Sequence, residues 1–208
     1  MNAFEQGLTR HLDAGWLLYA RNIRIGLIGA GGLGSNCAMH LARSGFSNLI
    51  LVDPDRIEAS NLNRQTFFLR QLGFPKVEAL RDNILAVNPA AQIETHILSV
   101  EETNIMALFG SCQAVIEAVD QAGTKRMIAE RLAPAGCLVV SASGMGGSGR
   151  TGAMRVHALG TNLVVVGDMA TPCDENTPPL SPGVGMAAAM QADIVLQHFL
   201  NQHQSSRT

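Results

Sequence analysis

The sequence contains no long apolar segment and no excess of basic residues. No apolar run reaches the roughly 20 residues that span a bilayer, and the polar first ten residues, which include Glu5, do not resemble a signal peptide. Lys and Arg number 15 against 17 Asp and Glu, giving a formal charge of −2, whereas nucleic-acid-binding domains are usually basic. We therefore expect a cytoplasmic protein whose partners are neither membranes nor nucleic acids.

Cysteine is scarce and scattered. The chain has four cysteines and no C-x-x-C pair, so the sequence shows neither a zinc-binding motif nor a dithiol redox motif. We expect no zinc and, because cytosolic thiols are normally reduced, no disulfide. The cysteines are Cys37, Cys112, Cys137 and Cys173.

The length and hydrophobic content fit one domain. With 208 residues, of which 47% are hydrophobic, the chain should bury roughly 70% of the surface that it exposes when unfolded. We predict a single domain over residues 1–208. Apolar residues at spacings of three and four predict an amphipathic helix over residues 1–20, and we expect a flexible tail over 201–208.

Short apolar segments alternate with helical patterns, which is typical of a parallel sheet with right-handed crossovers. The predicted class is α/β and Rossmann-like, with a mostly parallel sheet flanked by helices and a short antiparallel extension. Strands are predicted at 23–28, 48–52, 93–98, 114–119 and 137–141, with the extension at 153–157 and 163–166. Helices are predicted at 33–44, 75–88, 103–109, 124–132 and 183–200. The last helix is largely apolar, so we expect it to be deeply buried or at a subunit interface.

A glycine-rich turn joins the first strand to the first crossover helix. Gly29, Gly31 and Gly34 form G-x-G-x-x-G, a pattern that lets a phosphate-bearing ligand approach the backbone at a helix N-terminus; a purely structural tight turn is the alternative. Asp53 follows Gly34 by 19 residues, at the carboxyl end of the second strand. A carboxylate there can accept both ribose hydroxyls, although a surface-loop aspartate is the plainer interpretation.

The long polar loop after Asp53 favours ATP over a dinucleotide. A positioned Arg and Lys stabilise charge that builds on phosphate oxygens during transfer, and Arg64 and Lys76 can supply these cations. Asp120 follows the fourth strand at the same edge of the sheet and is predicted to hold Mg²⁺ against the phosphates; an N-cap role for the next helix is the alternative. The other polar residues of the loop are Asp55, Ser60, Asn61, Asn63 and Gln65.

Five motifs in order resemble the ThiF/MoeB/HesA superfamily, the ubiquitin-activating-enzyme-like adenylyltransferases. They are Gly29-Ala30-Gly31-Gly32-Leu33-Gly34-Ser35-Asn36, Val52-Asp53-Pro54-Asp55, Ser60-Asn61-Leu62-Asn63-Arg64-Gln65, Pro75-Lys76 and Val119-Asp120. The Gly34-Ser35-Asn36 segment and the compact length are most similar to the short form of ThiF, which activates the sulfur carrier ThiS in thiamine biosynthesis.

The resemblance implies a reaction and a set of roles. The C-terminal glycine carboxylate of a small ubiquitin-like sulfur carrier protein, ending in Gly-Gly, attacks the α-phosphate of ATP, and pyrophosphate leaves. By position, Gly32 lies against the nucleotide, Asp53 holds the ribose, and Ser60 to Arg64 and Lys76 contact the phosphates. Asp120 holds Mg²⁺, with Gln121 beside it, and a homodimer is expected.

The sequence departs from the family at three points. It lacks the two C-x-x-C pairs that bind zinc in many relatives. Cys173 lies where several relatives hold a reactive cysteine, but the neighbouring Asp174 and Glu175 should raise its pKa. The arginine that relatives contribute across the dimer has no clear match; Arg10 and Arg21 are the candidates, against an ordinary surface role.

Two other functions are compatible with parts of the sequence. The glycine loop alone would also suit an NAD(P)-dependent oxidoreductase, but Tyr19 is the only tyrosine, so the Tyr-x-x-x-Lys pair of short-chain dehydrogenases is missing. A catalytically silent scaffold would have no need to keep Asp53, Arg64, Lys76 and Asp120 together. The glycine-rich segment 144–149 is expected to clamp an extended carrier tail or to be a plain mobile connector.

Overall fold

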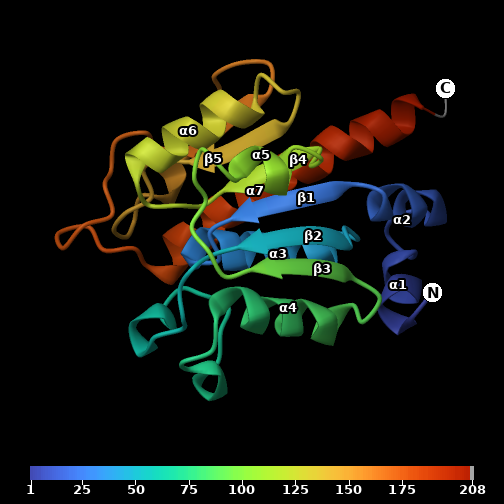
Figure 1. The fold of residues 1–208 in the computed structure, drawn as a ribbon, viewed down its shortest axis with the longest axis horizontal. Coiled ribbons are helices and arrows are strands. Elements are labelled where there is room, and N and C mark those ends of the chain that lie inside the picture. Colours follow the sequence, from blue (N-terminus) through green and yellow to red (C-terminus); the bar gives the residue numbers. More distant parts are fainter. Residues whose placement is uncertain (207–208) are drawn as a thin grey trace.

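The computed structural model describes residues 1–206 and contains one seven-stranded sheet in the order β3-β2-β1-β4-β5-β7-β6 (Figure 1). All neighbouring pairs are parallel except β6 and β7, which are antiparallel, so the predicted fold class is confirmed. The strands are β1 Arg24–Ile28, β2 Asn48–Val52, β3 Gln92–His96, β4 Ala114–Glu117, β5 Leu138–Ala142, β6 Arg155–Ala158 and β7 Leu163–Gly167. The helices are α1 Ala3–Leu8, α2 Ala14–Arg21, α3 Gly32–Arg43, α4 Lys76–Val87, α5 Ile105–Phe109, α6 Ala122–Leu132 and α7 Ser181–Ser205, with short 3-10 turns at Ala59–Asn61, Leu69–Gln71 and Thr151–Ala153.

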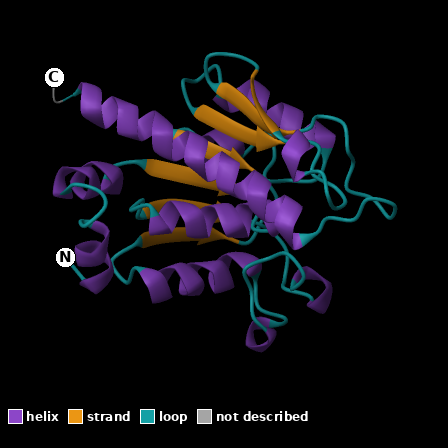
Figure 2. Ribbon diagram, turned by 180° about the vertical axis from the view of Figure 1, so that it is seen from behind, coloured by secondary structure: helices purple, strands orange, loops and turns teal. Residues whose placement is uncertain are grey.

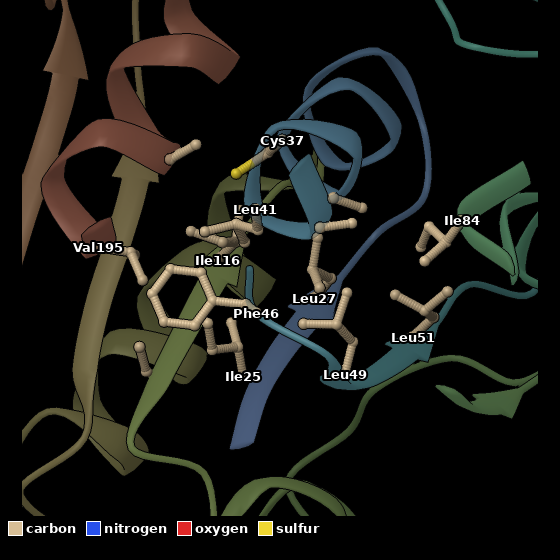
Figure 3. Packing of buried hydrophobic residues seen from close by; sticks show 14 of the residues in the cluster. Ile25, Leu27, Cys37, Leu41, Phe46, Leu49, Leu51, Ile84, Ile116 and Val195 are labelled. Carbon is tan, nitrogen blue, oxygen red and sulfur yellow. The ribbon is translucent and has the colours of Figure 1, made fainter. Parts of the chain in front are cut away.

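Helices cover both faces of the central strands, which is why those strands are apolar on both sides. Ile25 and Leu27 of β1 pack in one cluster with residues of α3, α4 and α7, part of which Figure 3 shows. Ile28 belongs to the opposite cluster, with residues of α5 and α6. Successive side chains of a strand point to opposite faces, so β1 divides the core into these two layers.

Helix α7 is largely apolar because it packs inside the fold. It lies across the strands next to α3, as Figure 2 shows, and the small side chains of Ala187, Ala188 and Ala192 are buried in that contact region. Val195 and Phe199 continue the buried side. Although α7 has 25 residues, neither it nor any other helix within residues 1–206 has the apolar length needed to cross a membrane.

The two ends of the chain differ from the prediction. The helix expected over 1–20 is split into α1 and α2, because the Asp13 side chain accepts the Trp16 N–H at 3.0 Å and starts a new helix there. Helix α7 begins two residues earlier than expected, at Ser181, and continues to Ser205 instead of ending at Leu200. Residues 201–205 of the predicted tail are therefore helical, and 207–208 lie outside the described residues.

Gly26 in the middle of β1 gives a test of this packing. A Cβ at this position would overlap the Phe109 ring and lie 3.0 Å from Val115 Cγ2, so we expect Gly26→Ala to lower the free energy of unfolding by about 1–3 kcal/mol. Chemical denaturation followed by circular dichroism measures this. Gly123→Ala is the control, because a Cβ at Gly123 in α6 meets nothing within 4 Å; equal losses in the two variants would contradict the packing described for β1.

Candidate active site

The candidate site lies at the carboxyl edge of the sheet, where the strand order reverses between β1 and β4. Gly29 follows β1, Asp53 follows β2, and Asp120 lies three residues after the end of β4. Parallel neighbours end at the same edge, so these three segments meet there. In open α/β sheets, ligands bind in the crevice at such a reversal point.

The three glycines of the G-x-G-x-x-G loop have different physical roles. Gly29 has a left-handed φ of +97°, and a Cβ on Gly34 would overlap the Gly29 carbonyl oxygen, so the chain's own packing requires both. By contrast, a Cβ on Gly31 would meet only Gln65 Nε2, at 3.8 Å. Gly31 is also the N-cap of α3 and has no side chain to occupy the free N–H groups there. The space and the donors at Gly31 therefore suit a phosphate.

Gly32 is tied to the packing of the site. A Cβ on Gly32 would lie 2.9 Å from Val184 Cγ1, near the start of α7, and 3.4 Å from Arg64 Cγ. The missing side chain thus makes room for the Arg64 stem and for α7. The sequence interpretation placed Gly32 against the nucleotide; in the structure, Val184 of α7 and the Arg64 stem lie beside it.

Asp53 braces the glycine loop. Its carboxylate is 6% exposed, and Oδ2 accepts the Ala30 N–H at 2.6 Å while Oδ1 accepts the Asp55 N–H at 2.8 Å. The alternative of an exposed surface-loop aspartate is therefore wrong. Each oxygen keeps a lone pair for a further donor, so a ribose hydroxyl remains compatible with this arrangement.

Lys76 is held by carboxylates. Its Nζ lies 2.6 Å from Asp55 Oδ2 and 3.9 Å from Asp53 Oδ1, and the residue is 7% exposed. Asp55, one of the polar loop residues of the predicted nucleotide site, forms this ion pair with Lys76. Because the Asp55 side chain is largely exposed, the pair is weakened by solvent, and a phosphate could replace Asp55.

Arg64 is a cation without a carboxylate partner among residues 1–206. Its guanidinium donates to Asn63 Oδ1 at 2.8 Å and to the Ser60 carbonyl at 3.3 Å, and its stem lies beside Gly32. Asn61 accepts the Glu58 N–H at 3.1 Å, which folds the loop around the 3-10 turn Ala59–Asn61. Ser60 and Asn63 are exposed beside Arg64. The neutral partners leave the Arg64 charge available to an anion above the glycine loop.

Asp120 and Gln121 lie in the turn between β4 and α6. Both are exposed, and within residues 1–206 no hydrogen bond or ion pair involves the Asp120 carboxylate. The N-cap of α6 is Gln121, so the alternative in which Asp120 caps this helix is wrong. Residues 1–206 hold no cluster of three His, Cys, Asp or Glu side chains arranged for a metal ion. A lone, unpaired carboxylate fits Mg²⁺ only if phosphate oxygens and water complete the shell, which is the usual way that Mg²⁺ binds with nucleotides.

The sequence interpretation missed a buried charged cluster beneath this turn. Glu117, the last residue of β4, is 1% exposed; its carboxylate accepts the Val119 N–H at 2.8 Å and two hydrogen bonds from Lys125 Nζ at 2.9 and 3.0 Å. The Ser141 hydroxyl donates to the same carboxylate. Strand β4 ends at Glu117 and not at Val119. The Ala118 N–H still donates to the Ile28 carbonyl at 2.9 Å, but the Val119 N–H is taken by the Glu117 side chain and does not continue the ladder. The available signal was a charged residue inside an apolar strand.

A residue of α7 joins this cluster to the sheet. Gln191 is fully buried, and its Nε2 donates to the Glu117 carbonyl at 3.2 Å and to the Val140 carbonyl at 3.0 Å. These carbonyls belong to neighbouring strands, so the glutamine links α7 to β4 and β5 at the edge that carries the candidate site.

Cys173 lies in the loop between β7 and α7. Its thiol is exposed, yet partial desolvation and the Asp120 carboxylate raise its pKa, with Arg64 opposing them and Asp174 adding to the increase. Asp120 and Arg64 therefore both lie within electrostatic range of this thiol. The sequence analysis expected a raised pKa for Cys173, and the structure agrees with that direction. Asp120 contributes more to the increase than the sequence neighbour Asp174.

The glycine-rich segment 144–149 packs against the Cys173 loop. A Cβ on Gly146 would overlap the Pro172 carbonyl oxygen, and the Gly147 N–H donates to the Pro178 carbonyl at 3.0 Å. The lack of side chains at these glycines thus allows the two loops to approach each other closely.

The two arginines proposed to act across a dimer have different environments. Arg21 Nη2 lies 2.6 Å from Oε1 of Glu5, which is only 3% exposed. Burial acts to raise the pKa of Glu5, but the hydrogen bonds from Arg21 and the Asn2 backbone outweigh it and lower that pKa. Arg21 is therefore engaged in anchoring α1, whereas Arg10 is exposed.

Comparison with known proteins gives partial sequence matches and nearly complete structural matches. The chain is 31% identical over 134 residues to the adenylyltransferase and sulfurtransferase UBA4 of Vanderwaltozyma polyspora, covering 64% of this chain and 31% of the yeast protein. It is 32% identical over 117 residues to the probable adenylyltransferase/sulfurtransferase MoeZ of Mycobacterium tuberculosis, covering 56% of this chain and 30% of that protein. The chain thus spans about a third of the length of these curated relatives.

Two solved structures share the fold. The Escherichia coli tRNA N6-threonylcarbamoyladenosine dehydratase TcdA in complex with AMP superposes with a TM-score of 0.86 at 19% identity, covering 98% of this chain and 95% of that one. E. coli MccB with ATP superposes with a TM-score of 0.71 at 20% identity, covering 91% of this chain and 59% of that one. A sequence profile described as the ThiF family matches residues 10–208, and the chain therefore belongs to the ThiF family.

Proposed function

We propose that this chain is an ATP-dependent adenylyltransferase that activates a carboxylate on a small ubiquitin-like carrier protein. The observation that carries the proposal is Arg64, a cation with neutral partners that lies beside the glycine loop. The pyrophosphate of a bound dinucleotide is met by the helix N-terminus, whereas transfer at a triphosphate builds charge on phosphate oxygens that a positioned cation stabilises.

The proposed reaction is a single displacement at phosphorus. An oxygen of the carrier's C-terminal glycine carboxylate attacks the α-phosphorus of ATP, the bond to the β-phosphate oxygen breaks, and an acyl-adenylate and pyrophosphate form. The N–H groups at Gly31 and the α3 terminus bind phosphate oxygens, Arg64 and Lys76 offset the negative charge, and Asp53 holds the ribose.

Asp120 is the residue that would hold Mg²⁺. Its carboxylate is exposed and unpaired within residues 1–206, beside Gln121 in the turn between β4 and α6. Bound Mg²⁺ neutralises charge on the phosphate oxygens. The proposed nucleotide site also includes Asp55, Ser60, Asn61 and Asn63. Asp55 contributes by its ion pair with Lys76, and the other three belong to the loop that carries Arg64.

The proposed substrate is a sulfur carrier whose tail ends in Gly-Gly, as for ThiS in thiamine biosynthesis or a related sulfur transfer. UBA4 and MoeZ, named as adenylyltransferases and sulfurtransferases, support this class of reaction. TcdA, whose name gives it a tRNA substrate, is the structural counterexample, but the net charge of −2 gives this chain no basic excess for RNA. A cytoplasmic homodimer is part of the proposal and rests on the family; α7 lends it no support, because its apolar side is buried within the fold.

The first experiment is ATP–pyrophosphate exchange with Mg²⁺ and candidate carriers. We expect exchange that depends on a carrier ending in Gly-Gly and disappears when its final glycine is deleted. Parallel assays with a threonylcarbamoyladenosine-bearing tRNA test the alternative substrate class. Absence of exchange with every carrier would sink the proposal.

Arg64→Ala should reduce kcat/KM for exchange strongly. Losing one charge-stabilising donor typically costs about 2–3 kcal/mol of transition-state stabilisation or more, which corresponds to roughly a 30- to 150-fold loss. Arg70→Ala is the matched control, because Arg70 lies in the same loop segment and its guanidinium rests on the Phe68 ring. A similar loss in both variants would point to general damage of the loop and not to a role of Arg64.

Asp55→Asn should strengthen ATP binding. The substitution removes the nearest negative charge from Lys76, leaving only Asp53 Oδ1 at 3.9 Å. An ion pair that solvent screens on one side, as here at Asp55, is worth about 1 kcal/mol, or roughly fivefold in Kd. Calorimetry with ATP measures the change. Asp82→Asn on α4 carries the same change in charge as a control; a weaker affinity in Asp55→Asn alone would show that Asp55 helps to bind the nucleotide.

Cys173 should react as an unactivated thiol. A raised pKa means that the thiol stays protonated at neutral pH and that its thiolate appears only as the pH rises past the ordinary cysteine range. We expect the rate of iodoacetamide alkylation at Cys173 to be low at pH 7 and to keep rising through pH 9, with Cys173→Ser as the unlabelled reference and unchanged pyrophosphate exchange in that variant. A plateau below pH 8 would contradict the electrostatics described here.

A further inference from the structure

Asn36 links the glycine helix to the loop that carries Arg64. Its Nδ2 donates to the Gly32 carbonyl at 2.7 Å, one turn earlier in α3, and to the Arg64 carbonyl at 2.8 Å, 28 residues later in the chain. The amide nitrogen carries two hydrogens, so both are used. One side chain therefore fixes the backbone of Arg64 relative to the N-terminus of α3.

The adjacent residue makes a parallel contact. Ser35 is fully buried, and its hydroxyl oxygen accepts the Thr66 N–H at 3.2 Å. Consecutive residues of α3 thus hold the chain on both sides of Gln65. Within residues 1–206 these are the only hydrogen bonds between segment 60–66 and α3, since the guanidinium of Arg64 bonds within its own loop.

The hydrogen bonds from Ser35 and Asn36 determine which side chains of segment 60–66 lie beside the glycine loop. The Arg64 stem would lie 3.4 Å from a Cβ on Gly32, and Gln65 Nε2 would lie 3.8 Å from one on Gly31. Gln65 is 8% exposed, and its Oε1 has no hydrogen-bond partner in the described chain. A shift of the loop away from α3 would move both side chains off the place where the phosphate is expected.

We propose that Asn36 is a positioning residue that sets the guanidinium of Arg64 over the glycine loop. The inference rests on the proposed function, since it assigns Asn36 a role toward the anion that Arg64 would bind. The chemistry at this position is specific, because Asp has the same shape as Asn but would place an oxygen against two carbonyl oxygens. The proposal makes the effect of Asn36 on anion binding depend on Arg64, and this dependence separates positioning from a general contribution to folding.

A double-mutant cycle between Asn36 and Arg64 tests the dependence. In the wild-type background we expect Asn36→Ala and Asn36→Asp to weaken ATP binding, measured by calorimetry, and to lower kcat/KM for pyrophosphate exchange by about tenfold. In the Arg64→Ala background the same substitutions should change either quantity less than twofold. Asn22→Ala is the matched control, because Asn22 Nδ2 donates to the Leu18 carbonyl at 2.9 Å at the end of α2, far from the site.

The outcomes separate the two proposals. Equal tenfold losses in both backgrounds, or no loss in either Asn36 variant, would overturn the positioning role. Thermal unfolding followed by circular dichroism identifies a variant that fails to fold, and Asn36→Ser then takes its place in the cycle. If the wild type shows no exchange with any carrier, the proposed function fails; the cycle in ATP affinity still decides whether Asn36 acts through Arg64.

Discussion

The hydrogen bond from the Ala30 N–H to Asp53 Oδ2, at 2.6 Å, is the contact on which the rest of the site depends. It joins the first residues beyond β1 to the first residue beyond β2, inside the protein, where a charge-assisted hydrogen bond is strong. The other oxygen of the same carboxylate accepts the Asp55 N–H and so sets the start of the long loop. The glycine turn and the segment leading to Lys76 are thereby held by one side chain, which is why a buried aspartate is tolerated here.

Charge is distributed unevenly around the crevice. On the β2 side, Lys76 is balanced by Asp53 and Asp55. On the β4 side, Glu117 is neutralised by Lys125 and satisfied by the Val119 N–H and Ser141, so that it contributes rigidity and no free charge. Arg64 and Asp120 lack such partners within the described residues. A buried charge needs a partner to remain stable, whereas Arg64 and Asp120 are more accessible and remain free to bind a ligand. This contrast distinguishes the charged groups that stabilise the fold from the groups proposed to act on the substrate.

Close packing shapes the crevice as much as charge does. Gly34 lets α3 approach the Gly29 turn, Gly32 makes room for Val184 and the Arg64 stem, and Gly146 lets two distant loops touch. Helix α7 contributes Val184 to one of these contacts and Gln191 to the buried cluster, so a helix remote in sequence completes the site. Among Gly29, Gly31, Gly32 and Gly34, Gly31 is the one where a Cβ would meet no atom closer than 3.8 Å.

The sequence by itself determined the order of strands and helices, the parallel sheet, the glycine turn and the meeting of Asp53 and Asp120 at one edge, because hydrophobic periodicity and the parallel crossover rule are local or nearly local information. The tertiary structure alone decided that Asp53 braces Ala30, that Asp55 holds Lys76, that Glu117 is buried with Lys125, and that Asn36 holds Arg64. It also decided that the N-terminal helix is interrupted between Leu8 and Ala14 and that α7 is covered by α3 and the sheet. Each of these depends on which side chain lies within about 3 Å of a partner elsewhere in the fold, a distance that hydrogen bonding demands and that no pattern of residue types along the chain specifies.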